Sequence, residues 1–264
     1  MSDADSKRNP QYFVDSLQQH VLAPLSTAES RLNREHAEVI VERDAFEAFR
    51  ERLDSIDPAP STSPDRATRI SNHASTTDRV DRVRTAYHET VLNMPHYDDT
   101  YDESLIEHLA GEFGPKIAEG VRPESSVSFT AAYKHVLIEV AAEAAQRREN
   151  FLETIDEEAR SIESAWTDLK DIFAALDTTI IPEWHCESFT EQLDAVAQRR
   201  QRTIQQRDSV PRFDDHSLCA YLYENESWTY PVLTAVARTR EAVSLERSTR
   251  PGTTNAADPG RRNS

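Results

Sequence analysis

Glycine is scarce in this chain, with only five among 264 residues, at positions 111, 114, 120, 252 and 260. Glycine-rich phosphate loops and dinucleotide-binding fingerprints need closely spaced glycines, so both motifs are excluded. The tight turns of β-hairpins also depend on glycine, so the composition disfavours a β fold. We therefore expect an all-α protein.

Cysteines and long apolar runs are equally sparse. Cys186 and Cys219 are too few for a disulfide framework and fit a reducing compartment. The N-terminal segment has no apolar stretch typical of a signal peptide, and no run approaches the roughly 18 apolar residues of a transmembrane helix. We expect a cytoplasmic protein that does not enter a membrane.

Basic residues are outnumbered, with 30 against 47 acidic residues and a formal net charge of −17. Such a surface repels itself in dilute buffer, whereas molar salt shortens the Debye length to about 3 Å. This composition is typical of proteins from a salt-rich cytoplasm, and an ordinary acidic coiled-coil protein is the alternative. The same charge makes binding to nucleic acid or to an anionic membrane unfavourable.

Two segments carry an unbroken heptad pattern, in which apolar positions recur in alternating steps of four and three residues. This spacing of about 3.5 residues predicts the seam of a coiled coil. The first seam runs from Val21 to Ile56 and the second from Leu137 to Leu176. Glu35, Glu42, Arg148 and Glu158 also occupy seam positions, where charges cost stability but fix the register or pair with one another.

The expected fold is an elongated antiparallel helical hairpin or coiled-coil bundle, with a small helical subdomain at one end and a C-terminal helical cap. An intermolecular coiled coil, which would form a homo-oligomer through the same seam, is the alternative. Pro24 either kinks the first helix or begins it afresh. The expected segments are a disordered N-terminus (1–10), a long heptad helix (11–56), a polar Pro/Ser/Thr linker (57–76), a helical subdomain (77–126), a second long helix (127–177), a third bundle helix with the cap (178–247) and a disordered tail (248–264).

Aromatic residues gather at two places that suit partner binding. Residues 219–238, "CAYLYENESWTYPVLTAVAR", are the most aromatic stretch of the chain, and we expect them to seal the end of the bundle. Contact of Trp228 and Tyr230 with a protein partner is the alternative. In "MPHYDDTYDES", Tyr97 and Tyr101 are the corresponding candidates, and His96 lies beside them.

A metal site is the remaining chemical hypothesis. His185, Cys186, His216 and Cys219 are the ligand types that bind zinc tetrahedrally. However, the intervening helix of about 20 residues would hold the two pairs roughly 30 Å apart unless the chain folded back. The acidic residues around His96 fit a solvated loop better than a cation site. No nucleophile motif appears, so we expect neither a cofactor nor an enzyme.

Three segments together resemble an uncharacterised helical family of halophilic archaea, a domain of unknown function. They are "HVLAPLSTAESRLNREHAEVIVERDAFEAFRERL", "MPHYDDTYDESLIEHLAGEFGP" and "CAYLYENESWTYPVLTAVA". The resemblance covers about residues 10–245 and implies a haloarchaeal source, but it implies no activity, cofactor or catalytic residue. We interpret the chain as a helical scaffold or protein-interaction protein whose partner is unknown. A transcription-associated regulator and a metal-binding protein are the alternatives.

Overall fold

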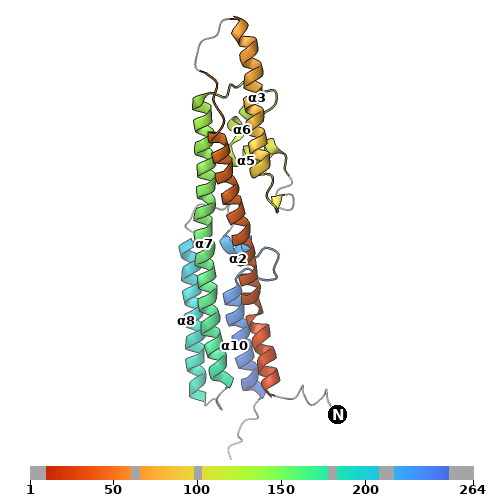
Figure 1. Ribbon diagram of the computed structural model, residues 1–264. Helices are drawn as coiled ribbons and strands as arrows, with labels where there is room; N and C mark the ends of the chain where they lie inside the picture. Colours follow the sequence, from red (N-terminus) through yellow and green to blue (C-terminus); the bar gives the residue numbers. More distant parts are fainter. Residues whose placement is uncertain (1–9, 61–65, 98–102, 178–182, 208–216, 250–264) are drawn as a thin grey trace, which may run out of the picture. The chain divides into compact units, whose positions relative to one another are not determined.

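The computed structural model describes the backbone of residues 10–60, 66–97, 103–177, 183–207 and 217–249 (Figure 1). It describes the side chains of residues 19–60, 78–97, 103–175, 188–206 and 217–241. Every regular element in these residues is a helix, which confirms the all-α prediction. The helices are α2 (Pro10–Asp54), α3 (Arg66–Thr90), α5 (Leu105–Phe113), α6 (Pro115–Val121), α7 (Ala131–Asp177), α8 (Glu183–Arg207), α9 (Leu218–Leu222) and α10 (Pro231–Thr249).

The chain divides into two compact units, and the two longest helices contribute to both. Unit 1 comprises Met1–Arg31 and Ala159–Ser264, and unit 2 comprises Leu32–Glu158. Each unit buries its own set of apolar side chains. None of the described helices is both long and apolar enough to cross a membrane.

The heptad seams of α2 and α7 are buried within a single chain. In unit 2 the buried seam residues are Leu32, Val39, Phe46, Phe49 and Leu53 of α2 and Leu137, Ala141, Ala144 and Ile155 of α7. In unit 1 they are Val21, Leu25 and Ala28 of α2 and Ile162, Ala165, Leu169 and Ile172 of α7. The residues that the heptads assign to the two seams are therefore largely buried, and packing within the chain supplies their burial.

Ion pairs between the two helices fix their direction in unit 2. Arg43 Nη1 lies 2.8 Å from Glu149 Oε2, and Lys134 Nζ lies 3.4 Å from Asp54 Oδ1. Because higher residue numbers on α2 meet lower numbers on α7, the helices run antiparallel, as the sequence predicts.

Helices α3, α5 and α6 complete the core of unit 2. The Tyr87 ring of α3 meets the Phe49 ring edge to face, with centroids 4.9 Å apart. Phe113 of α5 packs against both rings at centroid distances of 6.0 and 6.3 Å. These contacts join the small helices to the helical pair through aromatic area, which is the largest apolar contribution that single residues can make.

The structure corrects the extent of the predicted linker. Helix α3 begins at Arg66, so residues 66–76 are helical, and the connection that follows the end of α2 at Asp54 is residues 55–65. The three prolines of this region, at positions 58, 60 and 64, all precede Arg66. Beyond Pro64 there is no helix breaker, so averaging the composition over the whole segment hid the start of the helix.

Gly120 also has a different role from the helix-ending glycine that its position suggests. Helix α6 continues to Val121, and a Cβ atom added at Gly120 would lie 2.3 Å from the Tyr133 hydroxyl oxygen. This hydroxyl donates a hydrogen bond to the carbonyl of Ile117 at 3.0 Å. Gly120 therefore permits the close approach of α7 to α6. Helix α7 itself begins at Ala131, four residues later than predicted.

In unit 1, the N-terminal part of α2 and the C-terminal part of α7 pack with α8 and α10 (Figure 1). Pro24 lies inside a continuous α2, so it does not begin the helix afresh. Proline has no backbone N–H, so it leaves the carbonyl of residue i−4, His20, without its helical donor. Arg238 of α10 donates a hydrogen bond to that carbonyl at 3.0 Å. The carbonyl left open by Pro24 and the side chain that donates to it thus come from distant parts of the chain.

The predicted disordered ends, 1–10 and 248–264, lie almost entirely outside the described residues. The exceptions are Pro10, which begins α2, and Ser248 and Thr249, which are the last residues of α10.

Candidate functional site

The most concentrated polar feature of unit 2 surrounds Arg148, at a seam position of α7. Its Nε donates to Glu42 Oε2 on α2 at 3.0 Å, and its Nη1 donates to Glu112 Oε2 on α5 at 2.8 Å. A second bond, from Nη2 to Glu112 Oε1, makes the contact with Glu112 bidentate. The side chains of these three residues are only 11–15% exposed. We call Glu42, Glu112 and Arg148 the seam ion cluster. The contact between Glu42 and Arg148 confirms that these two charged seam residues pair with each other.

Two neighbouring residues extend the seam ion cluster. Arg147 Nη2 donates to Glu112 Oε2 at 2.9 Å, and His96 Nε2 lies 3.4 Å from Glu42 Oε1. On its other side the Arg148 guanidinium lies over the Phe46 ring, 4.6 Å from the centroid. An arginine suits this position because its planar fork can meet a carboxylate and an aromatic face at the same time.

Local sequence determines how α5 presents Glu112. Ser104 and Glu107 form a reciprocal capping box that starts α5, as the serine cap in the sequence indicates. Gly114 ends the helix with a φ of 89°, a conformation that residues with a Cβ atom rarely adopt. The helix is therefore only nine residues long, and Glu112 is one residue from its end.

Opposing effects set the charge of Glu112. Burial by itself raises the pKa of this carboxyl, but the hydrogen bonds and positive charges of Arg148 and Arg147 outweigh burial and lower the pKa below its usual value. For Arg148, burial lowers the pKa, and its bonds to Glu112 and Glu42 raise it above the usual value. Glu112 and Arg148 therefore carry opposite charges at neutral pH.

A second buried polar pair lies one helical turn away from Glu112. His108 Nδ1 and the Tyr87 hydroxyl are hydrogen-bonded at 2.6 Å, and His108 is 3% exposed. Burial, the largest effect, lowers the pKa of His108, while the nearby Glu112 charge acts in the opposite direction. The imidazole is therefore neutral at neutral pH.

The structure corrects the interpretation of Tyr97 as a partner-binding residue. Tyr97 is 4% exposed, its ring packs edge to face on His108, and its hydroxyl donates to the Glu103 carbonyl at 3.1 Å. These contacts place it in the core of unit 2, where no partner can reach it. Tyr101 lies outside the described residues. A run of polar residues around an aromatic looks exposed in sequence, but tertiary packing covers this one.

The aromatic stretch of unit 1 divides between core and surface. Leu218, Cys219, Leu222 and Tyr223 are buried, as expected for residues that seal a bundle. In contrast, Tyr221 is 43% exposed and Tyr230 is 37% exposed. Trp228 is half-buried, and its ring packs against that of Tyr223 with centroids 5.3 Å apart. We call Tyr221, Trp228 and Tyr230 the aromatic turn surface.

Contacts within unit 1 brace this turn. The Ser217 hydroxyl caps α9 by accepting from the Ala220 backbone N–H at 3.3 Å. The Glu226 N–H donates to the Tyr223 carbonyl at 3.0 Å, which closes the turn. Glu226 also accepts from Arg31 of α2, with Nη2 at 3.0 Å. The aromatic side chains therefore extend from a fixed backbone.

Of the four residues considered for zinc, only Cys219 has a described side chain. It is buried, and its Sγ accepts from Arg200 Nη2 of α8 at 3.3 Å. His185 and Cys186 lie in the first turn of α8 with side chains outside the description, and His216 lies outside the described residues. Cys186 and Arg200 are 14 positions apart on α8. At about 1.5 Å per residue this is roughly 21 Å along the helix, so Cys219 adjoins a different turn from Cys186.

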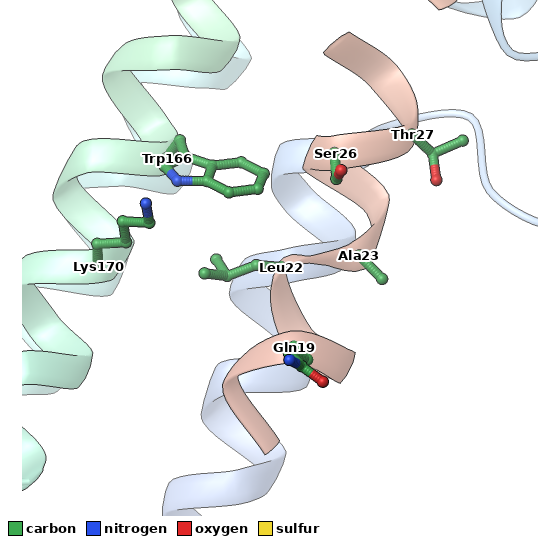
Figure 2. Close-up of a pocket in the computed structure, with 7 residues that line it drawn as sticks. All are labelled: Gln19, Leu22, Ala23, Ser26, Thr27, Trp166 and Lys170. Atoms are coloured by element: carbon green, nitrogen blue, oxygen red, sulfur yellow. The ribbon is translucent and has the colours of Figure 1, made fainter. Parts of the chain in front are cut away.

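A groove of about 630 Å³ lies between α2 and α7 in unit 1 (Figure 2). Its aromatic wall is Trp166 of α7, whose ring extends toward α2, and Lys170 lies one turn further along the same helix. The Lys170 ammonium lies 5.1 Å from the centroid of the Trp166 ring. The α2 side is lined by Gln19, Leu22, Ala23, Ser26 and Thr27.

Sequence reasoning missed Glu112, Arg147 and this groove. Glu112 follows His108 by four residues, which fits an ordinary helical contact and gives no sign of a bond to α7. The only local signal for the groove is the four-residue spacing of Trp166 and Lys170, which places them on one face of a helix.

Comparison with known proteins gives one match. No curated protein and no solved structure matches the chain. The family described as "Domain of unknown function (DUF7260)" matches residues 23–247, which is most of the chain. The chain therefore belongs to the DUF7260 family, a domain of unknown function.

Proposed function

We propose that this protein is a cytoplasmic, non-enzymatic interaction protein adapted to a salt-rich cell, and that it binds a protein partner through the aromatic turn surface. The observation that carries the proposal is the exposure of Tyr221 and Tyr230 beside the half-buried Trp228. Tyrosine and tryptophan are the residues most enriched among those that dominate binding energy at interfaces.

The braced backbone supports this assignment. Side chains on a fixed turn lose little conformational entropy on binding, and tyrosine and tryptophan have few rotatable bonds. The bond between Glu226 and Arg31 and the Tyr223–Trp228 ring contact hold the turn before any partner arrives. Binding therefore does not have to order the segment first.

Charge indicates the chemistry of the partner. Glu224 is exposed and lies between Tyr221 and Trp228 in the sequence, in a chain with a net charge of −17. An arginine- or lysine-bearing protein surface suits this combination, because a cation gains from both the carboxylate and the aromatic faces. The acidic composition supports the salt-rich setting, where screening allows such a surface to stay compact.

Pull-down from native lysate in molar KCl tests the proposal. The bait is the full chain, compared with a Tyr221→Ala/Tyr230→Ala variant. Val41→Ala/Val136→Ala serves as the matched control, because these valines of unit 2 are 36% and 40% exposed. We expect one stoichiometric partner to bind the wild-type and control baits and to be lost from the tyrosine variant, with unchanged helical circular dichroism. Retention of the partner by the tyrosine variant would contradict the assignment.

A further inference from the structure

The groove between α2 and α7 has the chemical features of a small-molecule site. Its volume of about 630 Å³ lies within the range of roughly 300–1,000 Å³ that is common for ligand pockets. Trp166 offers one flat aromatic face, and Leu22, itself 5% exposed, provides an apolar contact opposite it (Figure 2). Gln19, Ser26 and Thr27 add neutral hydrogen-bonding groups. Such a mixture of apolar walls and few polar groups is typical of ligand sites.

The charge of the groove differs from that of the chain as a whole. None of the seven described residues that line it is acidic, and the one charged side chain among them is Lys170, although the protein carries −17. Among the described residues Lys170 forms no ion pair, and its contact is with the Trp166 ring. A cation beside an aromatic wall is complementary to a ligand that is both aromatic and anionic.

We propose that the groove binds a small organic anion that carries an aromatic ring. The ring packs between Trp166 and Leu22, and the anionic group pairs with the Lys170 ammonium. The amide of Gln19 and the hydroxyl of Ser26 orient the ligand through hydrogen bonds. This site is separate from the aromatic turn surface and does not depend on the proposed protein partner.

Titration followed by nuclear magnetic resonance locates the binding directly. The ¹⁵N-labelled full chain contains three tryptophans, and Trp166→Phe assigns the indole N–H signal of Trp166. The probe is indole-3-acetate, and indole-3-acetamide is its uncharged control of the same shape. We expect indole-3-acetate to shift the Trp166 signal saturably and to bind about fivefold more tightly than the amide, which is the scale of one exposed charge pair.

Variants of Lys170 separate charge recognition from contact with the ring. Lys170→Gln should weaken binding of the acetate to the level of the amide, whereas Lys170→Arg should preserve the difference. Because Lys170 is exposed, both variants should fold like the wild type. A Trp166 signal that does not respond to indole-3-acetate, equal affinity for acid and amide, or an unchanged affinity in Lys170→Gln would each overturn the proposal.

Discussion

Removing the cation of the seam ion cluster should destabilise the protein strongly. Arg148→Met preserves the length and much of the apolar volume of the side chain, but it leaves Glu42 and Glu112 in a site where they are 11% and 15% exposed. Breaking a buried ion pair by removing one partner costs about 3–5 kcal/mol of unfolding free energy. The lower end of this range is expected, because Arg147 remains within 2.9 Å of Glu112.

The pH dependence of that loss identifies its cause. In the wild type the folded-state pKa of Glu112 is lowered, so its stabilising contribution is present above the unfolded pKa of about 4.3 and is lost as the pH falls. Without Arg148, burial and the neighbouring carboxylate should raise the pKa of Glu112, so the variant should gain stability as the pH falls toward that value. The stability difference between the two proteins should therefore shrink on acidification.

Urea unfolding followed by circular dichroism measures this difference, at constant KCl and at several pH values between about 4 and 8. Urea is preferable to guanidinium, which is itself a salt and would screen the charges. A variant with all three charges replaced, Glu42→Leu/Arg148→Met/Glu112→Leu, should recover most of the loss, because apolar packing often replaces a buried ion pair at little cost. A difference below about 1 kcal/mol, or one that does not change with pH, would refute the reasoning.

Two further predictions concern the backbone. Gly114→Ala should destabilise the protein by about 1–3 kcal/mol, because Gly114 has a φ of 89°. Gly111→Ala should stabilise it by about 0.5–1 kcal/mol, because Gly111 lies in the exposed interior of α5 with open space around it. Equal shifts in the melting temperatures of the two variants would contradict the helix-end assignment. Arg238→Met should lower the free energy of unfolding by about 1 kcal/mol, because the hydrogen bond to the His20 carbonyl of α2 is lost. Urea unfolding should show a smaller loss in a Pro24→Ala background, because the backbone N–H of the substituted residue then donates to that carbonyl. An equal loss in both backgrounds would exclude this compensation.

The sequence predicted the long helices because their apolar period is uninterrupted. The residues that the heptad assigns to the seam, from Val21 to Leu53 and from Leu137 to Ile172, are mostly those with the least exposed surface. Helix α5 likewise starts at a capping serine and ends at a glycine, because a helix start and a helix end depend on local chemistry. The start of α3 was not readable from composition alone, because a polar helix without an apolar stripe resembles a linker.

The candidate sites were much less predictable than the helices. Trp228 and Tyr230 were named from the sequence, and Tyr230 is exposed. Tyr97 was named on the same grounds and is buried, because α5 brings His108 and Glu103 against it. A single aromatic residue in a polar segment has no local signal that distinguishes a surface position from a covered one.

The sequence by itself determined the helical class, the family and the two seams, because these depend on periodicity and on residue types near one another in the chain. Only the tertiary structure decided that Arg148 joins α2 to α5, that Arg238 donates to the carbonyl left open by Pro24, and that Lys170 faces a groove. Each of these contacts involves residues from distant parts of the chain. Their geometry arises only when the helices pack, and a pattern along one segment carries no information about it.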